Sequence, residues 1–282
     1  MRLLLSLQEE SGAFESTVHI GAATLPDYNG FVTALVLREL GPLANSPGFQ
    51  DARDRALDFL EQCESPFRSG FFAFWPRNRW PYWLPIVLDD ADDTAVIASQ
   101  LLHHGRIDSG RARRIASEAL VPYRLENTAA GPEASWIRPG AFLTWLHHDC
   151  APNPIDCVVN VNVVAFLSQI GFRDRPGYRE ACEMVMAGIS WAARRWENLE
   201  VLSPYYPEPF ELVAALDYAL RSGASELRAA REELDRFPAS DVPDSRMRVL
   251  FSIADRSFLW SSAAVWAARR VVREARLSQK LD

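Results

Sequence analysis

The stretch "LDDADDTAVIAS", residues 88–99, crowds four carboxylates into five positions and then continues as an apolar helix. The carboxylates belong to Asp89, Asp90, Asp92 and Asp93. Each negative charge makes ionisation of its neighbours less favourable, so the cluster should raise the pKa of at least one member. Asp at a helix start also suits the N-cap and the positive end of the helix dipole. The stretch therefore predicts a helix beginning near residue 90, with an unusual acidic site at its start.

Apolar residues recur with helical spacing over most of the chain, and loops rich in Gly and Pro interrupt them. The segments with this spacing are residues 28–40, 49–63, 90–104, 109–123, 156–170, 177–196, 208–221, 225–235 and 257–277. Two short apolar stretches, residues 70–75 and 141–146, have the composition of strands but are too few to build a sheet. They are expected to connect helices, and the chain is predicted to be all-α.

Similar segments recur at intervals of roughly fifty to seventy residues, which indicates a repeat architecture. The turns "SGAF" at 11–14, "SGFF" at 69–72 and "PGAF" at 139–142 resemble one another. Helices that open on a polar residue follow, with starts at Asn29, Asp90, Asp156 and Glu208 and a looser copy at Ser257. These apolar helices alternate with charged ones, as inner and outer helices would. The pattern predicts one domain over residues 1–282, an α/α toroid of helical hairpins. The acidic stretch would face its central cavity.

Composition and charge limit the classes of function. The chain has 282 residues, 48% of them hydrophobic, which is enough to bury a large core. A net charge of −7 without a run of basic residues argues against a nucleic-acid partner. The apolar start is too short for a signal peptide or a membrane span, so a cytoplasmic protein is expected. The four cysteines show no CxxC spacing, which argues against a zinc knuckle and a disulfide framework.

The hexapeptide Asp90-Ala91-Asp92-Asp93-Thr94-Ala95 resembles the DxDDTA motif of class II terpene cyclases, the group that includes squalene-hopene cyclase. The Gly-aromatic turns and paired helices also resemble the prenyltransferase and squalene-cyclase repeat, a loose pattern that covers most of the chain. The resemblance implies an isomerase or lyase that protonates an isoprenoid double bond or epoxide and so starts a carbocation cyclisation. Asp92 would be the general acid, supported by Asp90 and Asp93. No metal or redox cofactor is implied, although Mg²⁺ would help to dock a diphosphate.

The proposed chemistry accounts for the crowded carboxylates. Protonating a carbon-carbon double bond needs a strong acid that stays protonated near neutral pH, and neighbouring carboxylates raise the pKa of one member. Related cyclases place a His beside the acid, a role open to His147 or His148, although a surface His pair is an equal alternative. The carbocation would need a dry pocket lined by aromatic rings. The candidates are Phe72, Phe74, Trp75, Trp80, Tyr82, Trp83, Trp136, Trp145, Tyr205, Tyr206 and Trp260.

The identity of the substrate is open at this stage. Arg77, Arg79 and Arg138 lie in aromatic loops and have the chemistry to bind a diphosphate, although loop arginines often pair with local acids instead. Phosphate binding would indicate a prenyl diphosphate. Without it, a neutral polyprene or a prenylated aromatic compound is favoured. Familiar class II cyclases place their site between two barrels, and this chain is long enough for one. Either a partner subunit, as in a homodimer, completes the site, or one barrel holds a smaller substrate, which is preferred.

Other interpretations compete with a cyclase. An Asp cluster at a helix start commonly does no more than cap the helix and lie on the solvated surface. A second class of function is a non-catalytic toroid that binds an isoprenoid or a protein. A third is a Mg²⁺-dependent prenyl-diphosphate lyase, since carboxylates hold magnesium. Such enzymes would need a DDxxD motif and a separate NSE-type ligand set, and "NVNVV", with Asn160 and Asn162, is not that set. A zinc site near Asp149 and Cys150 would lack its third ligand, because no His follows His148.

Overall fold

The computed structural model describes residues 1–43, 46, 48–84, 88–127, 135–238 and 249–278. Its strands are β1 (Glu15–Ile20), β2 (Ala23–Tyr28), β3 (Val249–Ser252) and β4 (Phe258–Ser261). Its α-helices are α1 (Arg2–Leu5), α2 (Gly30–Leu40), α3 (Gln50–Glu61), α4 (Ala91–His103), α5 (Ser109–Ile115), α6 (Cys157–Gln169), α7 (Tyr178–Trp191), α8 (Trp196–Leu202), α9 (Pro209–Arg221), α10 (Arg228–Leu234) and α11 (Ala263–Ser278). Each predicted helical segment contains one of these helices.

The all-α prediction is wrong, because the chain also forms a four-stranded antiparallel sheet in the order β2-β1-β4-β3. The hairpin of β1 and β2 turns at Gly21, whose φ of +59° is a conformation that glycine adopts readily. The pairing of β1 with β4 joins segments about 240 residues apart, for example Val18 with Trp260. Such pairing leaves no local pattern, and β4 lies inside the segment predicted as a helix from residue 257. That helix, α11, begins only at Ala263.

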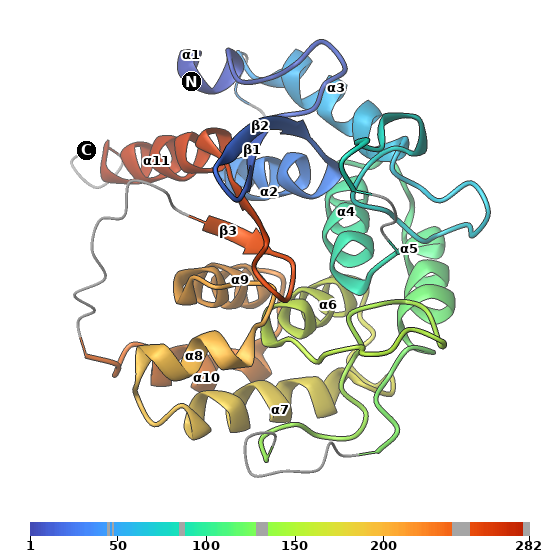
Figure 1. Ribbon diagram of the computed structural model, residues 1–282, viewed down its shortest axis with the longest axis vertical. Helices are drawn as coiled ribbons and strands as arrows, with labels where there is room; N and C mark the ends of the chain where they lie inside the picture. Colours follow the sequence, from blue (N-terminus) through green and yellow to red (C-terminus); the bar gives the residue numbers. More distant parts are fainter. Residues whose placement is uncertain (44–45, 47, 85–87, 128–134, 239–248, 279–282) are drawn as a thin grey trace.

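The prediction of an α/α toroid is also wrong, because the helices do not close into a ring by themselves. The helices α11, α2, α4, α6 and α9 form a row in which each packs against the next. In Figure 1, β3 lies between α9 and α2. In a toroid made only of helices, a helix would lie at this place instead of a strand. An ion pair between Arg269 of α11 and Glu211 of α9, 2.7 Å long, spans the two ends of the row. The site is therefore enclosed by both helices and strands.

Three helix starts share one local arrangement. Asn29, Asp90 and Asp156 are the N-caps of α2, α4 and α6, and their side chains accept backbone N–H bonds from the first turn of each helix. In each case a preceding Gly-aromatic turn is tied to the helix. The backbone N–H groups of Phe14, Phe72 and Phe142 donate to the side chains of Thr33, Thr94 and Asn160. The turns at residues 70–75 and 141–146 are connectors, as predicted, and form only isolated bridges.

The central helix α6 is buried on all sides, and every residue from Cys157 to Ser168 is buried. This explains its apolar sequence, since a helix that is hydrophobic all round belongs in a core. Its two amides, Asn160 and Asn162, are buried with it and are both hydrogen-bonded. Among the residues that the structure describes, no helix combines the length and the hydrophobicity needed to span a membrane.

Candidate active site

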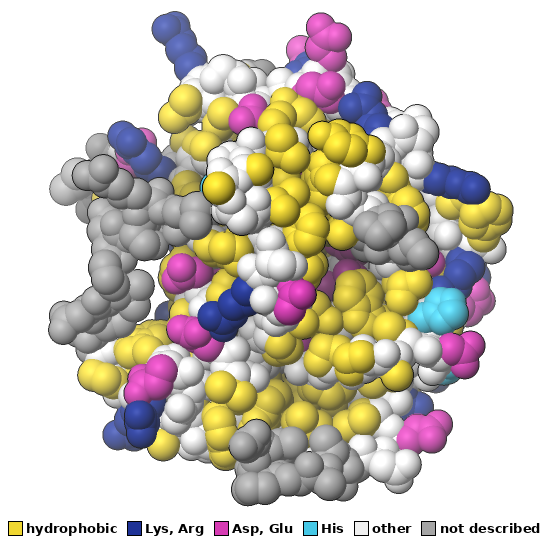
Figure 2. All heavy atoms as spheres, viewed as in Figure 1, with side chains coloured by type: hydrophobic (Ala, Val, Ile, Leu, Met, Phe, Trp, Pro, Cys, Tyr) yellow, Lys and Arg dark blue, Asp and Glu magenta, His cyan; other side chains and the backbone are white. Residues whose placement is uncertain are grey.

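A pocket of about 460 Å³ opens at the N-terminal ends of α2, α4 and α6 and extends under the sheet. Its volume is within the range of small-molecule sites. Hydrophobic side chains gather around the centre of the molecular face shown in Figure 2. The lining residues are Phe31, Phe74, Trp75, Leu84, Leu88, Asp90, Asp92, Asp93, Thr144, Trp145, Cys150, Ala151, Pro152, Val159, Tyr205, Tyr206, Phe251, Ser252, Ile253 and Trp260. The pocket is thus an apolar, aromatic cavity with three carboxyl groups in its wall.

The acidic residues are placed by the start of α4. Asp90 is the N-cap, and its Oδ1 accepts a 2.6 Å hydrogen bond from the backbone N–H of Asp93. Asp92 and Asp93 occupy the first turn and are buried, with 5% and 1% of their surfaces exposed. The connector at 141–146 holds this helix start, because the N–H of Ala91 donates to the carbonyl of Thr144 at 2.8 Å. The acidic cluster is therefore part of the molecular interior.

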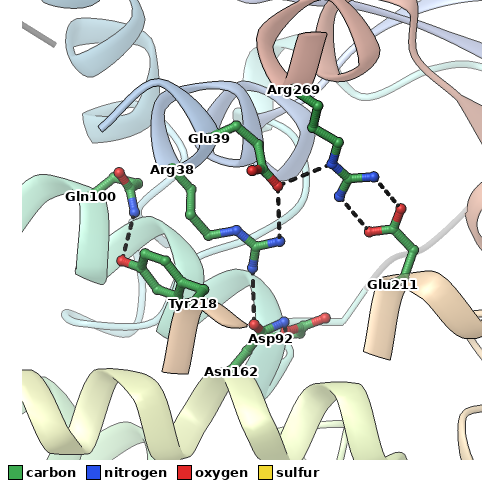
Figure 3. A network of polar contacts seen from close by, with 8 residues as sticks. All are labelled: Arg38, Glu39, Asp92, Gln100, Asn162, Glu211, Tyr218 and Arg269. Carbon is green, nitrogen blue, oxygen red and sulfur yellow. Dashed lines mark hydrogen bonds and ion pairs between the residues drawn. The ribbon is translucent and has the colours of Figure 1, made fainter. Parts of the chain in front are cut away.

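The side chain of Asp92 has a donor on each carboxyl oxygen. The Asn162 amide donates to Oδ1 at 2.7 Å, and the Tyr206 hydroxyl donates to Oδ2. Behind Asn162, the guanidinium of Arg38 donates to the Asn162 Oδ1 at 3.1 Å, and Arg38 also lies 3.9 Å from Glu39 (Figure 3). These contacts orient the Asp92 carboxyl and connect it through α6 to a buried cation.

Burial and mutual repulsion set the acid strength of the cluster. Burial raises the pKa of Asp92 to about 6, while the Tyr206 and Asn162 hydrogen bonds and the charge of Arg38 oppose this rise. Burial and the neighbouring Asp92 charge raise the pKa of Asp90 to about 8. Burial and the charges of Asp90 and Asp92 raise the pKa of Asp93 well above its usual value. Carboxyl groups that remain protonated close to neutral pH are a feature of acid catalysts.

Replacing Asp93 with Asn should stabilise the protein at pH 8. The Oδ2 atom of Asp93 is buried and has no hydrogen-bond partner, so ionisation of this side chain is costly in the folded state. The pKa of the Asp93 carboxyl is higher in the folded protein than in the unfolded chain. The free energy of unfolding is therefore greatest at low pH, where both the folded and the unfolded chain are protonated, and it falls as pH rises through the pKa of the folded protein. The Asn variant escapes this loss. Its free energy of unfolding should exceed that of the wild type by roughly 1–3 kcal/mol at pH 8 in urea titrations.

The same comparison at pH 4 should show a much smaller difference, since the folded state of the wild type then binds the proton and the unfolded state binds it about half of the time. Asp174→Asn, at an exposed position, provides the matched control and should not change the slope of stability with pH. An Asp93→Asn protein that is less stable than the wild type at pH 8 would show that ionised Asp93 is accommodated in the fold.

The aromatic wall is held by a buried carboxyl group on β2. Asp27, 5% exposed, accepts hydrogen bonds from Trp75 Nε1 at 2.7 Å and from Trp260 Nε1 at 3.0 Å. It also accepts from Asn29 Nδ2 at 2.7 Å, so the N-cap of α2 belongs to the same network. Both indoles contact Phe74, with ring centroids 4.4 and 5.7 Å apart, and Trp260 also stacks on Phe251 at 5.3 Å. Asp27 therefore fixes which faces of these rings point toward the pocket.

The structure brings many of the predicted site residues together. The pocket is lined by Asp90, Asp92, Asp93, Phe74, Trp75, Trp145, Tyr205, Tyr206 and Trp260. Trp83 lies one layer behind, in contact with Trp75 and Trp260 at centroid distances of 5.8 and 6.3 Å. Phe72 is buried in the core and does not line the pocket, and the same holds for Trp136. Trp80 and Tyr82 are exposed.

The predicted polar residues of the loops lie outside the pocket. His147 and His148 are exposed, and His148 stacks on Tyr123 with centroids 4.5 Å apart. Arg79 pairs with Glu9 at 3.1 Å, and the Arg77 guanidinium lies 4.3 Å from the centre of the Phe67 ring. Arg138 donates to the backbone carbonyl of Ser135 at 2.7 Å. None of these side chains is part of the described pocket wall.

Several residues at the site were not predicted as site residues from the sequence, among them Asn162, Arg38, Asp27 and Phe251. One feature of the sequence pointed to Asn162: it is an amide inside an apolar helix, and a buried amide needs a hydrogen-bond partner. Arg38 had a similar signal, as a charge in the apolar helix "FVTALVLREL". Phe251 and Asp27 had none, since the sheet places them: Phe251 lines the pocket from β3, and Asp27 on β2 holds two of the lining tryptophans. Across the described part of the chain, no group of three His, Cys, Asp or Glu side chains is arranged to hold a metal ion.

No family model matches the chain, and no curated protein sequence matches it. Among solved structures, the type II terpene cyclase MstE from Scytonema, without ligand, is similar over 96% of this chain and 93% of that chain, with 15% identity and a TM-score of 0.47. A variant with its product, merosterolic acid A, is similar over 83% and 75%, with 16% identity and a TM-score of 0.40. Another variant, with the substrate geranylgeranyl dihydroxybenzoate, is similar over 83% and 74%, with 15% identity and the same score. These likenesses are weak.

Proposed function

We propose that the protein is a cyclase in which Asp92 protonates a double bond or an epoxide of a neutral isoprenoid. The protonated substrate closes rings as a carbocation and ends by losing a proton, so that substrate and product have the same mass. The observation that carries this proposal is a buried carboxyl group in the wall of an aromatic cavity, with hydrogen-bond donors on both of its oxygens.

The surroundings of Asp92 combine two requirements of a strong general acid. Burial disfavours the ionised form and raises the pKa of the Asp92 side chain to about 6, so a larger fraction of it carries the proton near neutral pH than for an exposed Asp. The Asn162 amide and the Tyr206 hydroxyl stabilise the carboxylate that remains after proton transfer. Because these donors are in place before the reaction, no reorganisation is needed as charge develops. The proton itself comes from the side chain, and the acid step uses no metal ion.

The remainder of the pocket suits a carbocation. Phe31, Phe74, Trp75, Phe251 and Trp260 provide a continuous group of aromatic rings across from the start of α4. A cation over the face of such a ring gains about 0.5–2 kcal/mol, and more when water is excluded. Ionised Asp92 would also face the positive charge that it has created. Apolar walls protect the cation from capture by water.

The charge of the pocket wall favours a substrate without a diphosphate. Among the described residues that line the pocket, there is no Arg, Lys or His, whereas three are Asp. A diphosphate placed there would meet carboxyl groups without a cation to bind it, which is unfavourable. Ser252 lines the pocket, and its Oγ is buried without a hydrogen-bond partner. It can therefore form a hydrogen bond with a polar group of the substrate. A hydroxyl or carbonyl of a polyprene or prenylated aromatic compound fits this position.

Incubation with a substrate panel tests the proposal. Purified protein is mixed with linear polyprenes, their epoxides, prenylated aromatic compounds and prenyl diphosphates, each with and without EDTA. We expect an isomer of unchanged mass from a neutral compound by mass spectrometry, at the same rate in EDTA. Release of diphosphate from a prenyl diphosphate, in a turnover that stops in EDTA, would instead identify a metal-dependent lyase. Binding of an isoprenoid without any product would support a non-catalytic carrier.

A further inference from the structure

A second cavity of about 460 Å³ lies at the other end of the helices that position Asp92. We call it the rear cavity. The residues that line it come mostly from the C-terminal halves of α2, α4, α6 and α9, whereas the pocket lies at helix N-termini. They are Arg38, Gly41, Pro42, Gln100, Leu102, His103, Gln169, Tyr218, Arg221 and Ser222. The proposed reaction uses none of this space.

Two guanidinium groups meet in the rear cavity. Arg38 and Arg221 lie 5.2 and 5.8 Å from the centre of the Tyr218 ring. Burial lowers the pKa of Arg221; the negative charge of Glu39 opposes this, and the positive charge of Arg38 adds to it. None of the described residues lining the rear cavity is Asp or Glu. The cavity therefore concentrates positive charge in a chain whose net charge is −7.

The nearest carboxylates are engaged elsewhere. Glu39 pairs with Arg269 at 3.1 Å, and its distance to Arg38 is longer, at 3.9 Å (Figure 3). Asp217 pairs with Arg231 at 2.7 Å. The buried guanidinium of Arg38 carries five N–H donors; among the described residues it makes one hydrogen bond, to Asn162, beside its longer ion pair with Glu39. A buried charge with this many donors left over calls for an anionic or strongly accepting partner.

Neutral groups in the same wall add directional donors. The Nε2 atoms of Gln100 and Gln169 both donate to the Tyr218 hydroxyl, at 3.0 and 2.8 Å. The hydroxyl proton of Tyr218 is then left for a further acceptor. Gln169 Oε1 is buried without a partner, so it can accept a hydrogen bond from a ligand such as a P–OH group.

We propose that the rear cavity binds a phosphate-bearing anion between Arg38 and Arg221. Guanidinium groups match the geometry of phosphate oxygens and bind them through paired hydrogen bonds, which an isolated chloride cannot accept in the same way. A neighbouring cavity of about 430 Å³ shares Arg221 and adds Arg269, Arg273 and Arg276. Its acidic lining residues are Glu39 and Asp217, so positive charge is in excess there too, which favours the approach of anions. The site is distinct from the pocket that holds the acid, and its existence does not depend on the reaction proposed there.

Titration calorimetry of the full chain with inorganic phosphate, and separately with inorganic diphosphate, tests this site. We expect saturable binding of at least one of the two at constant ionic strength, with sodium chloride giving no such signal. Arg221→Gln should weaken the binding about tenfold or more, since it removes charged hydrogen bonds to the anion. Arg221→Lys keeps the charge but loses the paired hydrogen bonds. Its affinity for the anion should therefore lie between that of the wild type and that of Arg221→Gln.

Arg270→Gln is the matched control, because it removes the same charge from an exposed pair with Glu274 on α11. It should bind phosphate like the wild type, and thermal unfolding checks that each variant is folded. The proposal is overturned if neither anion binds, or if Arg221→Gln and Arg270→Gln bind alike. Turnover of an isoprenoid in the front pocket does not enter this test, so the two proposals stand or fall separately.

Discussion

Replacing Asp92 with Asn should lower the rate of isoprenoid cyclisation by roughly 10²–10⁴-fold, the usual contribution of a general acid. The amide has no acidic proton, yet it has nearly the same size, so the pocket should keep its shape. Substrate binding should persist, because the apolar walls are unchanged. The loss should therefore affect kcat and leave KM nearly the same, as expected for an interaction made in the transition state. The rate is measured with the neutral substrate found in the panel, by mass spectrometry of the product.

Asp89→Asn is the matched control for this prediction. Asp89 belongs to the same acidic stretch, but its carboxyl faces Arg68 at 3.4 Å and does not line the pocket. This variant should retain most of the wild-type rate. If Asp92→Asn cyclises the substrate as fast as the wild type, Asp92 is not the acid and the proposed mechanism fails.

The rate of the wild type should also fall as pH rises. The reaction needs protonated Asp92, whose pKa is raised to about 6. As pH rises above this value, the protonated fraction falls about tenfold per pH unit, and kcat/KM should fall with it. The measurement is a pH profile of kcat/KM between about pH 5 and pH 9, with circular dichroism to confirm that the protein stays folded.

Replacing Asp27 with Ala should destabilise the protein by about 3–5 kcal/mol, the largest effect on stability that we expect from one substitution. The change would leave the indole N–H groups of Trp75 and Trp260 and the amide of Asn29 buried without their acceptor. Each unsatisfied buried donor costs about 1–3 kcal/mol. Urea denaturation followed by tryptophan fluorescence measures both the loss and the disturbance of the two indoles.

Two further variants show whether the cost comes from these donors. Trp75→Phe and Trp260→Phe each remove one donor to Asp27 while keeping an aromatic ring, and each should cost less than Asp27→Ala. A loss of under about 1 kcal/mol for Asp27→Ala would mean that water replaces the carboxylate. In that case the aromatic wall does not depend on Asp27.

Much of the helical part of the fold could be predicted from the sequence. The starts of α2, α4 and α6 follow from Asn29, Asp90 and Asp156, because N-capping is a local interaction between a side chain and the next turn. The acidic residues of the pocket could be predicted for the same reason. The strands could not, since β1 pairs with β4 across about 240 residues and its stability comes from that distant partner.

The sequence by itself determined which residues begin α2, α4 and α6, and that carboxyl groups crowd at the start of α4. Only the tertiary structure decided the surroundings that make this cluster useful. Asn162 and Tyr206 come from other elements to contact Asp92, and Asp27 reaches two tryptophans through the sheet. The physical reason is the distance along the chain over which each interaction acts. A helix cap depends on neighbours within one turn. Burial, hydrogen bonds between elements and the resulting acid strength depend on parts of the chain that only folding brings together.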